Sequence, residues 1–348
     1  MKLKSLIIGT AAALSVASMA IADRGSDGHV NIIYWQAPSI LNPYLSGGTK
    51  DVESSSMIIE PLARYNQDGE LTAWLVNEIP TVANGGVSAD LMSITWNITP
   101  GIKWSDGSAF TAHDVVFSGN YCMDPDGGCA QSNKLADVAN IEALDDLTVK
   151  VTFSVAKPFP YGPFVGAEQP IIQKAQFADC MGAKAPECTA ENFGPIGTGP
   201  FVVTDFKAND VITMEANPHY RDASKPAFAS VTFKGGGDAA AAARSVLETG
   251  EFDYAWNLQI DPTILANMAA VGKGTVISSF GTATERLMVN LSNPDPALGD
   301  LRSTLEGGPH PFLTDAAVRR ALSVSIDRNL LAEVGYGAAG KATCNIVP

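Results

Sequence analysis

The stretch S-I-T-W-N-I-T-P-G-I-K-W-S-D-G-S-A-F-T-A-H-D-V-V-F-S-G-N-Y-C, residues 93–122, decides the fold. Isoleucine and tryptophan alternate with polar residues over 94–98, and this period of two predicts a half-buried strand. A P-G pair and then a D-G pair follow, and each predicts a turn. The chain is therefore expected to double back twice within a few residues.

A helix is expected after the second turn. Thr111 stands three residues before Asp114, so a hydroxyl and a carboxylate can each accept an unpaired backbone N–H at a helix start. Val115, Ser118 and Cys122 would then share one face of that helix. These features alone predict a strand, two turns and a helix, and they indicate no ligand.

The order of these parts closely resembles the signature of the extracellular solute-binding proteins of ABC importers, peptide/nickel-binding family: tryptophan, x-P-G, an aromatic residue, D-G, then T/S-A-x-D-V-V-F-S. Two further stretches resemble the same family. They are P-I-G-T-G-P-F at 195–201, with N-P-H-Y at 217–220, and D-A-A-V-R-R-A-L-S-V-S-I-D-R at 315–328. The resemblance runs almost without a gap from Val30, and in the family the chain would continue past Pro348.

The resemblance implies an α/β, bilobal periplasmic-binding-protein fold of type II with an extra inserted α+β domain. Lobe I would comprise residues 23–49 and 193–285, and the inserted domain associated with it would comprise 50–192. Residues 286–348 would begin a second lobe that is incomplete in this chain.

The N-terminus predicts export. Residues 1–22 combine two lysines, a short apolar run and an A-I-A site, which is typical of a secretory signal peptide. The run is too short and too rich in small residues for a favoured membrane anchor. We expect cleavage before Asp23 and a mature protein in a bacterial periplasm, with length for about two domains.

The charge of the chain argues against one class of partner. It carries 23 Lys and Arg against 37 Asp and Glu, a formal net charge of −14, and loss of Lys2 and Lys4 would make it −16. Such a surface repels phosphate backbones, so nucleic acid is not expected to bind. Solubility explains the acidity without a cationic ligand.

The cysteines fall into two close pairs, Cys122 with Cys129 and Cys180 with Cys188. In an oxidising compartment this spacing predicts two local disulfides. A four-cysteine zinc site would need tighter spacing within each pair, so no metal is predicted. Cys344 is left over and would need a partner elsewhere.

The sequence offers no arrangement for catalysis. Neither H-E-x-x-H nor G-x-S-x-G is present, and the four histidines are scattered. We therefore expect no enzyme, no cofactor and no metal. The histidines are His29, His113, His219 and His310.

One stretch supports a rival function, an exported NAD-dependent oxidoreductase. Gly235, Gly237 and Ala240 satisfy G-x-G-x-x-A after a short strand, and Asp253 stands near the place of a ribose-binding acid. Export, the lack of a βαβαβ repeat and the family resemblance weigh against this function. A phosphate cradle at residues 197–199 is disfavoured too, because neither a lysine nor a helix start follows it.

Local signals predict the elements after residue 235. Asp238 should cap a helix that Gly250 ends, and Asp261 should begin a helix over 260–272. The resemblance implies a strand over 284–290 and a helix pair over 311–331, which Asp315 would start. The buried stripe of that pair would consist of Val318, Ala321, Leu322 and Ser325.

The resemblance places the ligand site where the first strand, 29–35, ends, at the glycine-containing loop 44–49 and along the segment from Asp253. Trp256 would be a packing wall beside the amide of Asn257, although Trp256 could equally belong to a core. The predicted ligand-binding residues are Trp35, Gln36, Tyr44, Ser46, Gly47, Tyr254, Trp256 and Asn257.

The function that the resemblance implies is that of a periplasmic, monomeric substrate-binding protein that delivers peptides to the permease of an ABC importer. Two lobes would close on a peptide held mainly through its main chain. Nickel complexes, oligosaccharides and opines remain alternatives within the same family. The residue that pairs with a peptide N-terminus would lie beyond Pro348.

Overall fold

A computed structural model describes residues 23–278 and 284–345. The predicted signal peptide, residues 1–22, lies outside these ranges, so its cleavage before Asp23 stays a prediction. None of the helices in the described ranges is both long and apolar enough to cross a membrane.

The chain divides into two compact units. One consists of Met1–Val30 and Pro38–Thr232, and the other of Asn31–Ala37 and Phe233–Pro348. This grouping differs from the predicted division into lobes and an inserted domain, which stays a prediction.

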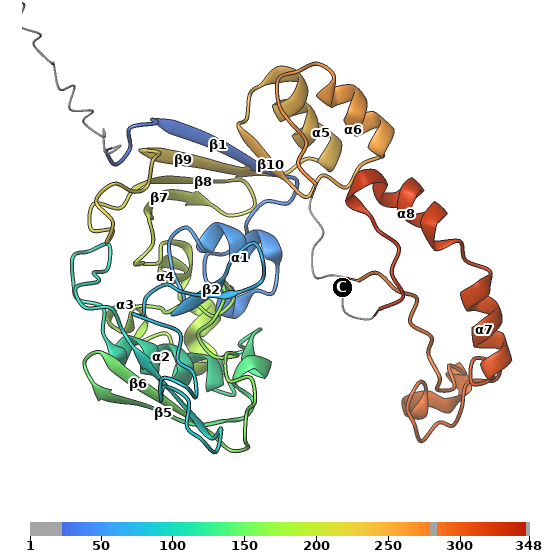
Figure 1. The fold of residues 1–348 in the computed structure, drawn as a ribbon, viewed down its shortest axis with the longest axis horizontal. Helices are drawn as coiled ribbons and strands as arrows, with labels where there is room; N and C mark the ends of the chain where they lie inside the picture. The colour runs from blue at the N-terminus through green and yellow to red at the C-terminus, as the bar shows by residue number, and fades with distance from the viewer. Residues whose placement is uncertain (1–22, 279–283, 346–348) are drawn as a thin grey trace, which may run out of the picture. The chain divides into compact units, whose positions relative to one another are not determined.

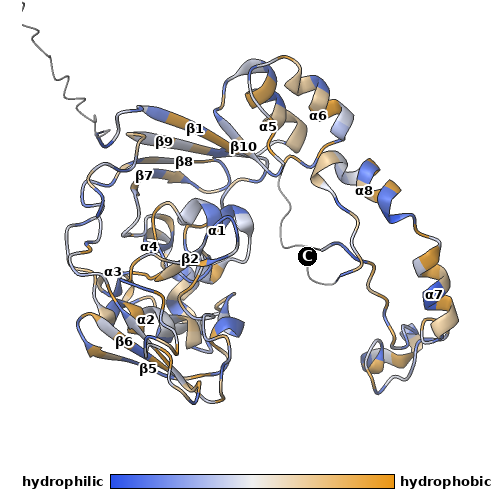
Figure 2. Cartoon of the chain, in the orientation of Figure 1, coloured by the Kyte–Doolittle hydropathy of each residue, from blue (hydrophilic) through white to orange (hydrophobic). Residues whose placement is uncertain are grey.

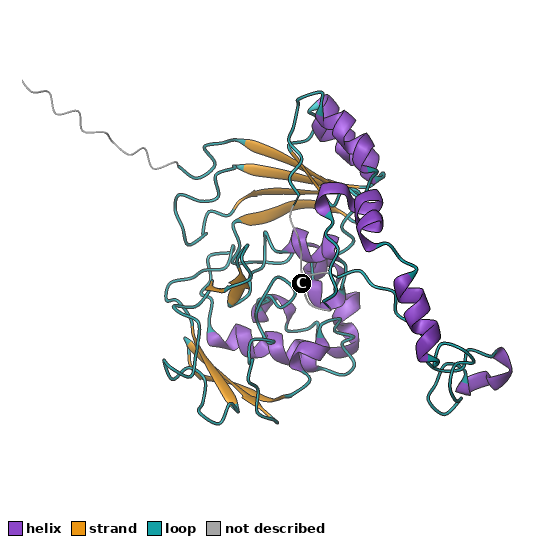
Figure 3. Cartoon of the chain, turned by 45° about the vertical axis from the view of Figure 1, so that its right-hand side comes forward, coloured by secondary structure: helices purple, strands orange, loops and turns teal. Residues whose placement is uncertain are grey.

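The strands and helices of the described residues are drawn in Figure 1 and Figure 3. The strands are β1 His29–Tyr34, β2 Ala63–Tyr65, β3 Leu71–Ala73, β4 Ser93–Asn97, β5 Val138–Asp145, β6 Thr148–Phe153, β7 Phe201–Lys207, β8 Val211–Ala216, β9 Ser230–Gly235 and β10 Tyr254–Trp256. The α-helices are α1 Thr49–Ser55, α2 Ala112–Met123, α3 Lys174–Phe177, α4 Thr189–Phe193, α5 Ala239–Arg244, α6 Pro262–Ala269, α7 Ala316–Val324 and α8 Arg328–Tyr336.

The strands form three sheets. The largest has the order β10-β1-β9-β8-β7, with β1 parallel to β10 and β7 antiparallel to β8. A three-stranded sheet has the order β4-β6-β5, and β2 pairs with β3. The fold is therefore mixed α/β, as the sequence predicts.

The stretch that decides the fold forms the expected elements. Strand β4 pairs antiparallel with β6, and Ile94 and Trp96 on its apolar face are fully buried. Thr111 and Asp114 form a capping box at the start of α2, in which the Thr111 amide donates to the Asp114 carboxylate at 2.9 Å. The strand, the turns and the helix start are confirmed.

Helix α2 packs tightly on the three-stranded sheet (Figure 1). Its predicted inner face, Val115, Ser118 and Cys122, is buried. A Cβ placed on Gly119 would lie 2.2 Å from Cδ1 of Ile141 in β5, so a larger residue here would require the Ile141 side chain to move.

Both predicted disulfides are present, Cys122–Cys129 and Cys180–Cys188, with Cα–Cα distances of 5.1 and 5.9 Å. Sγ of the second pair lies near Glu191, but sulfurs bonded to each other are not thiolates and cannot ligate a metal as such. Cys344 is exposed and free.

Removal of either disulfide should destabilise the native state by about 2–3 kcal/mol, the loop-closure value for loops of this size. The paired variants Cys122→Ala/Cys129→Ala and Cys180→Ala/Cys188→Ala would be compared with wild type by urea unfolding. Cys344→Ser is the control, because an exposed free thiol contributes no cross-link. An unchanged midpoint in both paired variants would contradict the prediction.

Two local predictions for the C-terminal third are wrong. Residues 284–290 form no strand, since no strand in the described ranges pairs with them, and Leu287 and Met288 are 78% and 83% exposed. The predicted helix pair exists as α7 and α8, with Asp315 and Asp327 as caps. However, its apolar residues, visible in Figure 2, are not buried: α7 and α8 contain no buried residue, and the contact between α6 and α8 does not bury the apolar residues of α8.

Candidate functional site

The ends of three strands meet in the unit that contains residues 31–37 and 233–348. Tyr34, the last residue of β1, pairs with Trp256, the last residue of the parallel strand β10. The amide of Gly236, just after β9, donates to the Tyr34 carbonyl at 3.2 Å. In open α/β sheets, ligands bind outside the carboxyl ends of parallel strands. This strand-end cluster, Tyr34–Gln36, Gly235–Gly237 and Trp256–Asn257, is our candidate site.

Three aromatic rings form the floor of the strand-end cluster. Tyr34 is buried and stacks on Trp256 with ring centroids 5.0 Å apart and planes at 22°. Phe233 of β9 packs against Tyr34 from another direction, at 4.6 Å. Trp256 is partly exposed. It is thus held from one side by the core, while part of its surface can still meet a ligand.

Asn257 has a left-handed backbone, with a φ of 55°. Among residues other than glycine, asparagine tolerates this conformation best. The turn is fixed by a hydrogen bond from the Gln259 amide to the Asn257 carbonyl at 2.9 Å. Unusual backbone conformations gather at binding sites, and here one aims an amide side chain directly after β10.

The other residues predicted in this unit are more exposed. Trp35 is partly buried and Gln36 is exposed, and both follow β1 directly. Tyr254 is 50% exposed and pairs with Ile32 near the start of β10, two residues before Trp256. The structure therefore brings Trp35, Gln36, Trp256 and Asn257 to the strand ends, and Tyr254 lies further along the sheet.

The glycine-rich turn has a packing explanation. A Cβ on Gly235 would lie 2.0 Å from Cα of Ala37, so this glycine lets two chain segments touch. Asp253, the proposed ribose-binding acid, accepts a hydrogen bond from the Asn31 amide at 2.8 Å. Asp238 caps α5 as expected, with its carboxylate 2.7 Å from the Ala241 amide. The motif is thus accounted for without a nucleotide.

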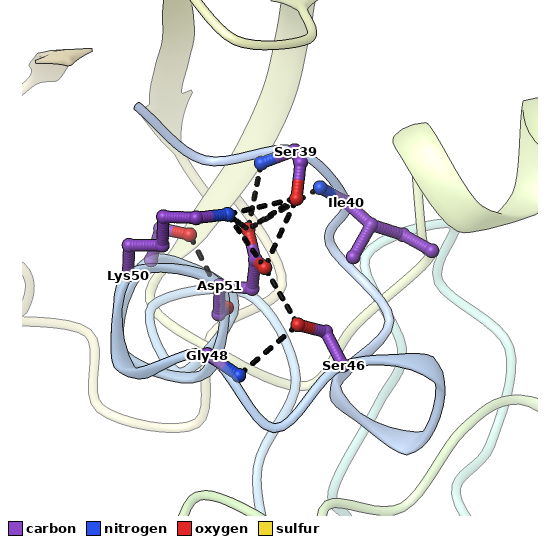
Figure 4. Close-up of polar contacts among 7 residues, drawn as sticks. Ser39, Ile40, Ser46, Gly48, Lys50 and Asp51 are labelled. Carbon is purple, nitrogen blue, oxygen red and sulfur yellow. Dashed lines mark hydrogen bonds and ion pairs between the residues drawn. The ribbon is translucent and has the colours of Figure 1, made fainter. Parts of the chain in front are cut away.

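The predicted contacts Ser46 and Gly47 belong to the other unit, in the loop 39–48 that leads into α1. Figure 4 shows how this loop surrounds one carboxylate, that of Asp51, which is 1% exposed. Asp51 accepts from the Ser39 amide at 2.6 Å, from the Ser46 hydroxyl at 2.7 Å and from Lys50 Nζ at 2.8 Å.

The Asp51 carboxylate is stable as an anion. Burial alone would raise its pKa, but hydrogen bonds from Lys50, Ser46 and Ser39, together with the Lys50 charge, lower the pKa below its usual value. Because the pKa of Asp51 is lower in the folded state, its carboxylate stabilises the fold at pH values above the unfolded pKa, near 3.8. This stabilisation is lost as the pH falls through the folded-state pKa. The loop contacts should therefore be intact at neutral pH.

Tyr44 has a different environment from Ser46 and Gly47. Its side chain is completely buried, its hydroxyl donates to the Pro170 carbonyl at 2.6 Å, and burial raises its pKa. We leave it out of the proposed contacts, because no part of its side chain is accessible. Gly47 is exposed, and a Cβ added to it would meet no atom within 4 Å.

Sequence reasoning missed Asp51 and, in the same unit, the buried Glu60. An acid in the first turn of α1 was a weak signal for Asp51, because it ordinarily indicates only helix capping. Nothing near Glu60 in the sequence indicates its partner, Arg221, which lies 161 residues away.

Two curated relatives align with most of this chain. Protein XP55 of Streptomyces lividans is 27% identical over 329 residues, 94% of this chain and 54% of that protein. The glutathione-binding protein GsiB of Pectobacterium atrosepticum is 26% identical over 303 residues, 87% of this chain and 52% of that protein. The chain thus spans about half the length of these relatives.

Solved structures share the fold. The murein tripeptide-binding protein MppA of Escherichia coli matches with a TM-score of 0.67 at 22% identity, covering 88% of this chain and 57% of that one. AppA of Bacillus subtilis, in complex with a nonapeptide, matches with a TM-score of 0.68 at 19% identity, covering 90% and 56%. The fold is that of the type II periplasmic binding proteins.

The sequence profile of the bacterial extracellular solute-binding proteins, family 5 (middle region), matches residues 74–348. This match covers most of the chain and includes the glycine-rich turn and the strand-end residues Trp256 and Asn257. The chain belongs to the bacterial extracellular solute-binding proteins, family 5.

Proposed function

We propose that this protein is the substrate-binding component of an ABC importer, that it acts in the bacterial periplasm as a monomer, and that it takes di- or oligopeptides and passes them to a membrane permease. Family membership carries the proposal. It binds its solute and makes or breaks no covalent bond.

Peptides are favoured by the names of the relatives. OppA of Bacillus subtilis is an oligopeptide-binding protein, GsiB binds glutathione, and AppA was solved with a nonapeptide. Other structures of this fold hold Ni(L-His), in NikZ of Campylobacter jejuni, and agropinic acid, in AgaA of A. tumefaciens R10. A nickel complex or an opine is therefore an alternative ligand. An oligosaccharide is a further alternative, which none of these named relatives supports.

The strand-end cluster supports peptide binding chemically. Trp256, backed by Tyr34, offers a fixed apolar surface for a side chain or for the flat face of a peptide group. The amide of Asn257 has both donors and an acceptor, which is what a peptide N–H and C=O require. Trp35 and Gln36 repeat this combination of an aromatic ring and an amide at the end of β1.

Replacement of Trp256 by alanine should weaken binding of trialanine about 10- to 100-fold, the usual effect of removing a buried aromatic contact. Isothermal titration calorimetry of the purified chain would measure the dissociation constant. The control is Phe159→Ala, because Phe159 is 60% exposed and lies in the other unit, outside every segment predicted to bind ligand. Equal losses in both variants, or none in either, would reject the proposed contact.

Titration of the wild-type chain with four probes tests the function itself. We expect heat from trialanine and none from Ni(II)–L-histidine, maltotriose or NAD⁺. Binding of Ni(II)–L-histidine or maltotriose in place of trialanine would support the role of a solute-binding protein but overturn the assignment of a peptide ligand. Binding of NAD⁺ would overturn the proposal as a whole.

A further inference from the structure

Asp51 makes an unusual set of contacts for an acid at the third position of a helix. Such an acid ordinarily accepts from the amides of its own first turn. In contrast, every hydrogen bond to the Asp51 side chain comes from the Ser39 and Ile40 backbone or from the side chains of Ser39, Ser46 and Lys50. Apart from Lys50 of α1 itself, the carboxylate therefore ties down the loop 39–48 rather than the amides of the helix.

The contacts continue from Asp51 to the tip of the loop. The Ser46 hydroxyl donates to Asp51 at 2.7 Å and accepts from the Gly48 amide at 3.1 Å. Gly47, between these two anchored residues, is exposed and has open space beside its Cα. Its neighbours Ser46 and Gly48 are both held (Figure 4), while its own backbone can be approached closely from outside.

Among the residues that the structure describes, the ion-pair partner of this carboxylate is Lys50, which belongs to the same cluster. Lys50 Nζ lies 2.8 Å from Asp51 and 2.8 Å from the Ser39 hydroxyl, and the Lys50 side chain is 20% exposed. Removal of the negative charge would free Lys50 as well as Ser39 and Ser46. One substitution at Asp51 should therefore release both ends of the loop.

We propose that Asp51 is a positioning residue for ligand binding, which holds Ser46, Gly47 and Gly48 in the conformation that meets the solute. The inference rests on the proposed function, in which Ser46 and Gly47 contact that solute. Asp51 itself is too deeply buried to touch a ligand.

Hydrogen exchange of the full chain tests the positioning without any ligand. In Asp51→Asn, peptides covering 38–48 should exchange about tenfold faster or more, the equivalent of losing a hydrogen bond to a charged group. Exchange elsewhere should stay near the wild-type rate. Val52→Ala is the matched control, since Val52 is a buried neighbour on α1 whose side chain makes no loop hydrogen bond, so its truncation weakens packing alone.

Calorimetry with trialanine then separates positioning from a purely structural role. We expect the dissociation constant to rise about tenfold in Asp51→Asn and to stay unchanged in Val52→Ala, even where both variants lose thermal stability. Faster exchange with unchanged affinity would overturn the proposal, and so would unchanged or uniformly raised exchange. If the wild-type chain fails to bind trialanine, the proposed peptide function fails, and the exchange rates of the loop still accept or reject its positioning by Asp51.

Discussion

Replacement of Arg221 by methionine should destabilise the protein by about 3–5 kcal/mol, because it would leave the buried Glu60 carboxylate without its ionic partner. Glu60 has no exposed surface. Arg221 donates to Glu60 twice, from Nη1 at 2.7 Å and from Nη2 at 3.3 Å. The remaining donors, Thr198 Oγ1 at 2.9 Å and Trp74 Nε1 at 2.6 Å, are neutral. The Arg64 charge also acts on Glu60 through space and would stay in place, so Arg221→Met removes the hydrogen-bonded cation and leaves this weaker one.

Urea unfolding of Arg221→Met, Glu60→Gln and the double variant would measure this effect. The double variant should be more stable than Arg221→Met, since it no longer buries an unpaired charge. The control is Lys225→Met, whose partner Asp222 lies 4.0 Å away at the surface, and its loss should change stability by at most about 1 kcal/mol. If Arg221→Met were no worse than Lys225→Met, the Glu60 cluster would contribute little to stability.

Elements with local signals could be predicted from the sequence. The capping box at Thr111 and the cap at Asp238 each depend on residues within a few positions of one another, and both are present. The same holds for both disulfides, which close short loops. Short-range features of this kind can be predicted without knowledge of any tertiary contact.

Features that depend on distant partners could not be predicted. The family resemblance implied a strand over residues 284–290, but a strand exists only where another backbone accepts its hydrogen bonds. The Glu60 cluster joins residues far apart in the sequence, and neither Glu60 nor Arg221 has a local signature. The sequence predicts the apolar stripe of α7 correctly. Burial of that stripe would require a surface to pack against, and no described element supplies one.

The candidate site likewise combines features that the sequence predicts with features that depend on tertiary contacts. Its location at Trp256 and Asn257 came from the resemblance, and the strand ends do meet there. The stacking of Tyr34 on Trp256 and the left-handed backbone of Asn257 are tertiary features, because they arise from register and turn geometry. The sequence predicts Tyr44, Ser46 and Gly47 as parts of one loop. In the structure, Tyr44 is completely buried and its hydroxyl donates to the Pro170 carbonyl, so its environment differs from that of Ser46 and Gly47.

The glycines of the P-I-G-T-G-P-F segment have a steric role. A Cβ on Gly197 would lie 1.8 Å from the carbonyl oxygen of Ile58, and one on Gly199 would lie 2.5 Å from the same atom. The Gly199 amide donates to that carbonyl at 2.8 Å. Two backbone segments therefore cross in direct contact. Thr198, which stands between the two glycines in the sequence, donates a hydrogen bond to Glu60. This crossing explains the glycines without a bound phosphate.

Replacement of Gly197 by alanine should therefore destabilise the protein by about 3 kcal/mol or more, since the obstructing atom is backbone and cannot rotate away. Gly47→Ala is the matched control, because the added methyl group meets open space and stability should change by no more than about 0.5 kcal/mol. Urea midpoints of the two variants would be compared, with soluble yield as a second readout in case Gly197→Ala does not fold. Equal stability of the two variants would show that the segments can separate at little cost, and the backbone crossing would then not be what requires glycine at residue 197.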